Sequence, residues 1–379
     1  MAAKSQQKCA LMLTGGGAQA AYQVGVLKAI AEWYPRVHHA PFSIYCGTSA
    51  GAINATAVAS YNACFRLGVK KLDWFWRRLH TNRVFAATFT GVSKHILGQV
   101  FGRMRASYLP PPTVSLLDNQ PLRSMLNEVI HYPRLEQQIR SQVLDALAVT
   151  VSSYQSGVSM SFYQGQGHFR PWTKAKHKGR PALIRNDHLL ASAAIPLLFP
   201  AVKIGDSYFG DGSIHQLSPL SPAIKLGADK ILIISVTPPR TGQKQTTEHP
   251  PGLGHISGHL LDTIFSDALT ADIEQLERTN LLIRHLTERQ KKSLDLRHID
   301  VCLMAPQRSF AHIARQFYGN MPIMVRVLMR LLGISPRDDA SITSFLLFEP
   351  AFIRALIEQG YQDAQKNRAK LHEFLEISK

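Results

Sequence analysis

Hydrophobic and polar residues alternate in blocks along the N-terminal part of the chain. Residues 10–13 and 42–46 are short, mostly apolar runs of the length typical of buried strands. Residues 20–33 carry apolar side chains at helical spacing, and the run of small residues at 52–63 also predicts a helix. Strands that alternate with helices favour an α/β fold in which helices cover a largely parallel sheet.

The same two patterns continue through the rest of the chain. Helical periodicity is found at residues 118–139, 260–286 and 351–375. Short apolar runs predict further strands at residues 147–153, 159–164, 231–236 and 299–304. We expect residues 231–236 to close the sheet and residues 165–179 to form a basic loop.

A serine between two glycines stands where the second predicted strand meets its helix, in Gly47-Thr48-Ser49-Ala50-Gly51. This is the arrangement of a nucleophile elbow, a sharp turn that presents the serine hydroxyl at the end of a sheet. Gly47 and Gly51 allow strained backbone angles and close approach of neighbouring chain. The N-terminus of the following helix favours negative charge beside the Ser49 oxygen. Ser49 is therefore the candidate nucleophile.

Three consecutive glycines, Gly15, Gly16 and Gly17, follow the first predicted strand and open its helix. Their main-chain N–H groups are suited to hold an anion. One candidate is a dinucleotide pyrophosphate, but its fingerprint has glycine where this chain has Ala20, and an acidic residue where this chain has the serine turn. The other is the oxyanion of acyl transfer, which requires only a pair of donors aimed at one oxygen. The serine elbow that follows favours the oxyanion hole.

Asp211 lies between Gly210 and Gly212, after an apolar segment. Taken alone, Asp-Gly is the commonest signal for a β-hairpin turn, and this interpretation is as well supported as a functional one. Together with a serine elbow, Asp211 becomes a candidate general base. Ser49 and Asp211 are far apart in the sequence, so only the fold can bring them together.

In this order, the motifs resemble those of the patatin-like phospholipases. The resemblance is carried by GGGAQ (15–19), GVL (25–27), GTSAG (47–51) and DG (211–212), and by the flanking segments 115–122 and 191–200. It spans residues 9–236 and implies a three-layer α/β sandwich with a mostly parallel central sheet. Residues 259–379 resemble the mainly helical extension that some bacterial members carry.

The resemblance implies a catalytic dyad in place of a triad. Ser49 attacks the ester of a phospholipid or lysophospholipid, and Asp211 accepts the proton of the serine hydroxyl. The N–H groups of Gly15, Gly16 and Gly17 stabilise the oxyanion. The resemblance implies no cofactor, and the histidine and cysteine spacings predict no metal site.

The chain departs from the family pattern at three positions. Gln19 stands where members usually carry Arg or Lys, Ala20 where they carry Gly, and Ser213 where they carry Gly or Ala. The lost cation is expected to weaken the positioning of a phosphate or of the glycine loop. These departures support an alternative from a different class, a catalytically weak or partner-activated scaffold that binds membrane or protein, with an activator protein as partner.

An ordinary α/β-hydrolase is the closest competing enzyme, because it also uses a serine elbow and the chain order Ser, Asp, His. The triad histidine would then be His215, His255 or His259. In that fold several strands precede the elbow, whereas here Ser49 follows the glycine loop directly. This order favours the dyad.

Length and composition are those of a globular enzyme with one large core and a smaller unit, since 45% of the 379 residues are hydrophobic. The four cysteines show no paired spacing, which favours a reducing compartment. No N-terminal stretch resembles a secretory signal, and no run approaches the ~18 apolar residues of a spanning helix. We expect a cytoplasmic protein that binds the membrane surface peripherally. Export by a specialised secretion system would leave no such signal.

The charge balance indicates an anionic partner, because 43 Lys and Arg stand against 26 Asp and Glu, for a formal net charge of +17. No nucleic-acid-binding motif is found, so nucleic acid is not the expected partner. An anionic membrane is the expected partner, and a solubilising surface is the alternative. Residues 74–78 combine aromatic and cationic side chains suited to an interface, although core packing more often explains such a stretch.

We therefore predict an acyl-hydrolase domain at residues 9–236. Residues 84–112 are apolar, low in acids and end in three prolines, and they predict a cap or insertion beside the site. Residues 237–258, rich in Pro, Gly, Thr and His, predict a linker or loop before the helical extension at 259–379. The predicted function is hydrolysis of phospholipid or lysophospholipid esters at a membrane surface.

Overall fold

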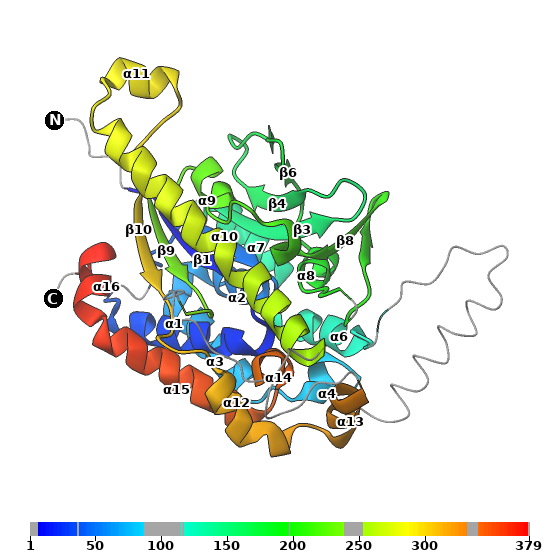
Figure 1. The fold of residues 1–379 in the computed structure, drawn as a ribbon. Coiled ribbons are helices and arrows are strands. Elements are labelled where there is room, and N and C mark those ends of the chain that lie inside the picture. The colour runs from blue at the N-terminus through cyan, green and yellow to red at the C-terminus, as the bar shows by residue number, and fades with distance from the viewer. Residues whose placement is uncertain are drawn as a thin grey trace.

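A single mixed sheet forms the centre of the molecule. The computed structural model describes residues 7–35, 38–86, 115, 117–196, 198–238, 253–331 and 340–377. Its strands are β1 (Cys9–Leu13), β2 (Ile44–Thr48), β3 (Ala146–Ser153), β4 (Ser159–Gly165), β5 (Trp172–Thr173), β6 (His177–Pro181), β7 (Val202–Ile204), β8 (Ser207–Asp211), β9 (Lys230–Ile234) and β10 (Asp300–Met304). Within the described ranges they form one ten-stranded sheet in the order β10-β9-β1-β2-β3-β4-β6-β5, with β8 paired to β3 and β7 to β8 (Figure 1).

The strands at one end of this order run parallel, from β10 through β9, β1 and β2 to β3. β4 and β8 then pair with β3 in the antiparallel direction. Because the carboxyl ends of parallel strands meet at one edge of a sheet, the segments that follow β1 and β2 begin side by side, with Leu13 opposite Gly47. The α/β class with a mostly parallel sheet is confirmed, and this edge positions both N-terminal motifs.

Helices cover both faces of the sheet. The helices among the described residues are α1 (Ala21–Trp33), α2 (Ala50–Ala59), α3 (Phe65–Trp76), α4 (Thr81–Val84), α6 (Gln120–Val129), α7 (Tyr132–Arg140), α8 (Asn186–Ser192), α9 (Ser221–Lys225), α10 (Leu253–Ile283), α11 (Glu288–Ser293), α12 (Ala311–Phe317), α13 (Ile323–Leu331), α14 (Ala340–Leu346), α15 (Pro350–Lys366) and α16 (Arg368–Phe374). Short 3-10 turns are η1 (Gly17–Ala20), η2 (Asn62–Cys64), η3 (Gly212–His215) and η4 (Tyr318–Asn320).

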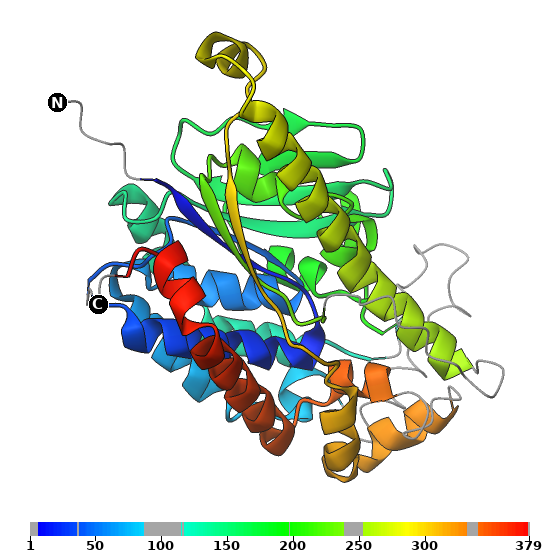
Figure 2. The ribbon, with the colours of Figure 1, turned by 60° about the vertical axis from the view of Figure 1, so that its left-hand side comes forward.

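Alternate side chains of β1 divide the apolar core into two layers. Leu11 and Leu13 belong to the larger cluster, which holds the apolar faces of α1, α2, α3 and α15. Ala10 and Met12 point to the opposite face and pack with residues of α9 and α10. Figure 2 shows α10 and α15 on opposite sides of the blue and gold strands β1 and β10. Successive side chains of a buried strand point to opposite faces of the sheet, so both faces are apolar and both are covered by helices. The result is three layers, with the sheet between two layers of helices.

The C-terminal region completes the sheet and the core. β10 pairs with β9, so the prediction that residues 231–236 close the sheet was wrong, and β9 lies inside the sheet between β1 and β10. α15 packs along α1, where a Cβ atom at Gly25 or Gly360 would overlap main-chain atoms of the other helix. The division into residues 9–236 and 259–379 stays a prediction; in the structure, elements from both ranges share one sheet and one core.

Several local predictions differ from the structure. The helix expected at 351–375 is divided at Asn367 into α15 and α16. The helix expected at 118–139 is divided into α6 and α7, because Pro133 lacks an N–H group and stands in the first turn of α7, where this loss is tolerated. The basic loop expected at 165–179 contains β5 and the first residues of β6. Most of the predicted cap at 84–112 and of the linker at 237–258 lies outside the described residues. The last residues of the predicted linker, 253–258, are helical and begin α10, so the loop prediction was wrong there.

A methyl group at Gly360 is expected to force α1 and α15 apart. Overlap with the Tyr22 carbonyl oxygen is not relieved by a rotamer change, so we expect Gly360→Ala to lower the free energy of unfolding by about 2 kcal/mol, in spite of alanine's higher helix propensity. Equilibrium chemical denaturation measures this change. Gly319→Ala is the matched control, since a Cβ atom there meets nothing within 4 Å. Equal unfolding free energies for the two variants would contradict this packing.

Candidate active site

Ser49 occupies a strained turn between β2 and α2. Its backbone angles are φ 55° and ψ −132°, a conformation that costs a residue with a side chain about 1–3 kcal/mol. The Ala52 N–H donates to the Ser49 carbonyl oxygen at 2.9 Å and closes the first turn of α2. The geometry is that of a nucleophile elbow, and the Ser49 side chain, with the residue 2% exposed, lies in the interior.

The two elbow glycines are required by close contacts. A Cβ atom at Gly47 would lie 2.5 Å from the Cα atom of Ala52. A Cβ atom at Gly51 would overlap the carbonyl oxygens of Leu13 and Thr14, at the end of β1. The absence of side chains therefore lets α2 pack directly against the strand that leads into the glycine loop.

The glycine loop, residues 15–17, lies at the same edge of the sheet as the elbow. Gly17 has φ 55° and begins η1, whose first N–H groups have no partner within the turn. A Cβ atom at Gly17 would overlap the carbonyl oxygen of Phe345 in α14. Gly17 and Ser49 line one cavity, so the structure brings together the predicted oxyanion loop and the predicted nucleophile.

Asp211 ends β8 and is buried beside Ser49. Its Oδ1 atom accepts a hydrogen bond from the Ser213 N–H at 2.9 Å, whereas Oδ2 is buried and has no hydrogen-bond partner among the described residues. Burial raises the pKa of Asp211 to about 6 from its ordinary value of 3.8, and the nearby Ser49 hydroxyl and Ser213 offset part of the rise. A carboxylate with one unsatisfied oxygen next to a serine hydroxyl is chemically equipped to accept that hydroxyl's proton.

The cavity at Ser49 is small and apolar, with a volume of about 50 Å³. Its walls come from helices far apart in the sequence, and include Phe75 and Trp76 of α3, Leu122 and Met125 of α6, and Phe345 and Leu346 of α14. A space lined in this way excludes water and suits a hydrocarbon chain, but at this volume it holds only a short part of one.

A buried polar network supports the glycine loop, and the sequence reasoning missed it. The Gln23 side-chain amide donates to the Thr14 carbonyl oxygen at 2.8 Å. Asn54 donates to Gln23 Oε1 at 2.9 Å, and Trp76 Nε1 donates to Asn54 Oδ1 at 2.7 Å. The network joins the loop to α1, α2 and α3. Polar residues inside otherwise apolar helices were the signal that would have indicated it.

Gln19 contacts the C-terminal region directly. Its Nε2 atom donates to Ser344 Oγ of α14 at 2.7 Å, and both side chains are buried. At the position where a cation was expected, this chain therefore has a neutral hydrogen bond that joins the turn after the glycine loop to α14.

No histidine contacts Asp211 within the part of the chain that the structure describes. His215 uses its main-chain N–H to bond Ser152 Oγ at 3.2 Å, and its Nδ1 atom is buried with no hydrogen-bond partner among the residues described. The side chains of His255 and His259 lie outside the described residues. Among the residues described, no group of three or more His, Cys, Asp and Glu is arranged to hold a metal ion.

A search for membrane-spanning helices found none among the described residues that combines enough length with enough apolar character.

Comparison with known proteins gives one match to a family model. The model described as patatin-like phospholipase matches residues 11–224. None of the curated proteins compared matches this chain. Among solved structures, VipD from Legionella pneumophila is 11% identical, with 96% of this chain and 67% of that chain covered and a TM-score of 0.36.

ExoU, a type III effector, is also similar. It is 15% identical, with 71% of this chain and 53% of that chain covered and a TM-score of 0.30. ExoU from Pseudomonas aeruginosa in complex with SpcU gives 16% identity, coverage of 72% and 52%, and a TM-score of 0.25. The match to this chain thus spans about half the length of ExoU.

The buried Asp211 carboxylate is expected to destabilise the fold at neutral pH. Because the pKa of Asp211 is higher in the folded chain than in the unfolded chain, its ionisation lowers the stability of the wild type as the pH rises from about 4 to about 6. Asp211→Asn removes this effect, so the variant should exceed the wild type by up to about 3 kcal/mol above pH ~6 and by little near pH ~4.

Urea denaturation at a series of pH values measures this difference in unfolding free energy. Asp206→Asn, on the exposed turn between β7 and β8, controls for the loss of an aspartate at the surface. A gap between Asp211→Asn and wild type that is the same at every pH would contradict the effect of burial.

Proposed function

The chain belongs to the patatin-like phospholipase family, and on that premise we propose that it is a serine acyl hydrolase that cleaves phospholipid or lysophospholipid esters. One observation carries this proposal. The hydroxyl of Ser49, in its strained turn, lies beside the buried carboxylate of Asp211 and faces the cavity that Gly17 also lines. The functional groups of acyl transfer therefore converge at one point.

In the proposed reaction, Ser49 Oγ attacks the ester carbonyl carbon while Asp211 Oδ2 takes the hydroxyl proton. The N–H groups of Gly15, Gly16 and Gly17 stabilise the negative oxygen of the tetrahedral intermediate. Its collapse breaks the bond to the alcohol, which leaves with the proton from Asp211. Water then attacks the acyl-enzyme with Asp211 again as base, and the fatty acid leaves as Ser49 regains its proton.

The environment of Asp211 compensates for the weak basicity of a carboxylate. Burial raises the pKa of Asp211 to about 6, closer to neutral pH, and proton transfer is most efficient when the pKa of the base is near the working pH. The Oδ2 atom accepts no hydrogen bond from the residues that the structure describes, which leaves one acceptor for the proton. A histidine is not needed in this scheme.

The small volume of the cavity supports a second candidate function. Ser49 is 2% exposed and the adjacent cavity is about 50 Å³, which is too small to hold a whole acyl chain. A scaffold that becomes hydrolytic only when a protein partner binds fits the same observation. Hydrolysis measured with no partner present distinguishes an enzyme that is active alone from such a partner-activated scaffold.

We propose an anionic membrane as the partner surface, bound through the exposed face of α3. Leu67, Lys70, Lys71 and Trp74 lie on this face at helical spacing and are all exposed. Arg78, in the turn after α3, is also exposed and lies over the Trp74 ring at 4.3 Å. Of the aromatic residues predicted to reach an interface, only Trp74 is exposed, at 56%. Aromatic rings and cations together suit the head-group region of an anionic bilayer.

The α3 face lies next to the candidate active site. A groove of about 480 Å³ borders Leu67, Lys71 and Trp74, and Phe75 lines both this groove and the cavity at Ser49. Phe75 and Trp76 are buried on the inner side of α3. One helix thus faces the proposed membrane with one side and the proposed acyl site with the other.

Removal of either dyad member is expected to abolish hydrolysis. Ser49→Ala and Asp211→Asn should each lower kcat by at least ~10³-fold, since neither the nucleophile nor the base has a substitute. Release of fatty acid from phospholipid and lysophospholipid micelles measures kcat, and kcat/KM of the wild type should rise with pH to a plateau above about 6.

Ser60→Ala is the matched control, because Ser60 is also buried but bonds only within α2 and its C-cap, through the Thr56 carbonyl oxygen. Substantial activity in Ser49→Ala would exclude Ser49 as the nucleophile. Substantial activity in Asp211→Asn would exclude the dyad.

Charge reversal on α3 is expected to weaken membrane binding. Lys70→Glu combined with Lys71→Glu should reduce binding to mixed neutral and anionic phospholipid vesicles by at least about tenfold, at ~1 kcal/mol for each lysine removed from the surface. Co-sedimentation of the protein with the vesicles at low and high salt measures this binding. Lys291→Glu with Lys292→Glu on α11 changes the net charge equally. The same loss in both double variants, or equal wild-type binding to purely neutral vesicles, would refute this assignment.

A further inference from the structure

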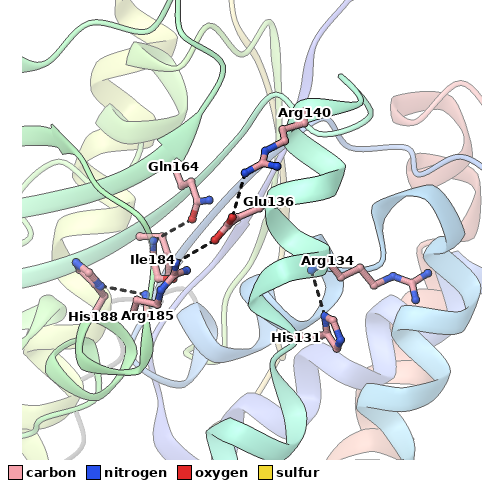
Figure 3. Close-up of polar contacts among 8 residues, drawn as sticks. All are labelled: His131, Arg134, Glu136, Arg140, Gln164, Ile184, Arg185 and His188. Carbon is pink, nitrogen blue, oxygen red and sulfur yellow. Dashed lines mark hydrogen bonds and ion pairs between the residues drawn. The ribbon is translucent and has the colours of Figure 1, made fainter.

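α8 is fixed at its N-terminus by hydrogen bonds to two other elements. The Arg185 guanidinium pairs with Glu136 of α7 at 3.0 Å, and the Arg185 N–H donates to His188 Nδ1 at 3.1 Å (Figure 3). The Ile184 N–H donates to Gln164 Oε1 of β4 at 2.9 Å. The start of α8 is therefore held between α7 and the sheet.

The C-terminal residue of α8, Ser192, contacts the main chain at the nucleophile. Ser192 Oγ accepts a hydrogen bond from the Ser49 N–H at 2.8 Å and donates one to the Thr150 carbonyl oxygen of β3 at 2.6 Å. Ser192 is fully buried. Its hydroxyl thus joins the strained turn to a rigid strand in the middle of the sheet.

The same segment contacts the main chain at Asp211. Two residues after Ser192, the Ala194 carbonyl oxygen accepts a hydrogen bond from the Asp211 N–H at 2.9 Å. Asp211 is also opposite Val151 in the pairing of β8 with β3, next to the Thr150 that Ser192 bonds. Three consecutive residues therefore hold both main-chain positions on which the proposed dyad depends.

We propose that Ser192 is a positioning residue that sets the distance and orientation of the Ser49 hydroxyl relative to Asp211. The inference rests on the proposed function and adds a residue to it. Ser49 has a backbone conformation that relaxes unless its surroundings hold it, and the Ser192 bond is made by the N–H of that very residue. Ser192 does not react itself, because its hydroxyl hydrogen and an acceptor lone pair are both used and the residue is fully buried.

Removal of the hydroxyl should affect the chemical step more than substrate binding. We expect Ser192→Ala to lower kcat about 10- to 100-fold, the loss that follows from a misplacement of reacting groups by about 1 Å, while KM changes by less than about threefold. Ser192→Thr retains the oxygen and should recover most of kcat. The pH midpoint of kcat/KM should move upward in Ser192→Ala, because a displaced Ser49 hydroxyl no longer offsets the rise in the pKa of Asp211, and should stay at the wild-type value in Ser192→Thr.

Ser161→Ala is the matched control for loss of a buried hydroxyl. Ser161 is also fully buried, and its Oγ bonds Thr150 Oγ1 and His177 Nε2, each at 3.0 Å, whereas the hydrogen bonds of the described residues include none from Ser161 to Ser49 or Asp211. Ser161→Ala should lower thermal stability by an amount similar to Ser192→Ala and leave kcat within about twofold. A purely structural role for Ser192 predicts equal effects of the two substitutions on kcat.

The experiment compares wild type, Ser49→Ala, Ser192→Ala, Ser192→Thr and Ser161→Ala in hydrolysis of phospholipid and lysophospholipid micelles. If Ser192→Ala does not fold, Ser192→Cys, which keeps the volume and weakens both hydrogen bonds, should show the same selective loss of kcat. Wild-type kcat in folded Ser192→Ala or Ser192→Cys would overturn the positioning role. Hydrolysis by Ser49→Ala at the wild-type rate would instead overturn the proposed function, whatever the Ser192 variants show.

Discussion

The left-handed backbone turn at Ser49 is the constraint on which the rest of the structure depends. A residue with a side chain holds φ 55° only if its surroundings offset about 1–3 kcal/mol of strain. β2 is fixed between β1 and β3, and Gly51 lets α2 rest on the end of β1. Ser192 bonds the strained residue itself. Each of these contacts is made to a strand of the parallel sheet or to the segment that follows one. The order of the strands therefore determines whether Ser49 can be held in its strained conformation.

Tight packing at this turn also shapes the electrostatics of the site. The same burial that holds Asp211 against β3 excludes water, raises the pKa of its carboxyl group to about 6 and leaves Oδ2 without a partner among the residues that the structure describes. Such burial of a carboxylate lowers the stability of the fold at neutral pH, and in the proposed mechanism it makes Asp211 a better base, a combination common at functional sites. The elements after residue 259 take part in it, because α14 contributes Phe345 and Leu346 to the cavity wall.

Local features of the site were predictable from the sequence, and long-range ones were not. The strands and helices on either side of the glycine loop and of Ser49 were indicated by periodicity and glycine placement, which act within a few residues. The contact between Ser192 and Ser49 joins residues 143 positions apart and has no local signature. The apolar run at residues 299–304 indicated a strand, but its pairing with β9 at the edge of the sheet follows a long helix and was not indicated locally. Pro133 was a signal for the break between α6 and α7, but continuous helical periodicity outweighed it.

The central claim is that Ser49 is a nucleophile activated by Asp211, and covalent labelling tests it most directly. Wild type and the Ser49→Ala and Asp211→Asn variants are incubated with a fluorophosphonate, and the adduct is located by mass spectrometry of peptides. The account predicts one adduct on Ser49 in the wild type, none in Ser49→Ala and at most slow labelling in Asp211→Asn. An adduct on another residue, or labelling of Asp211→Asn at the wild-type rate, would contradict it.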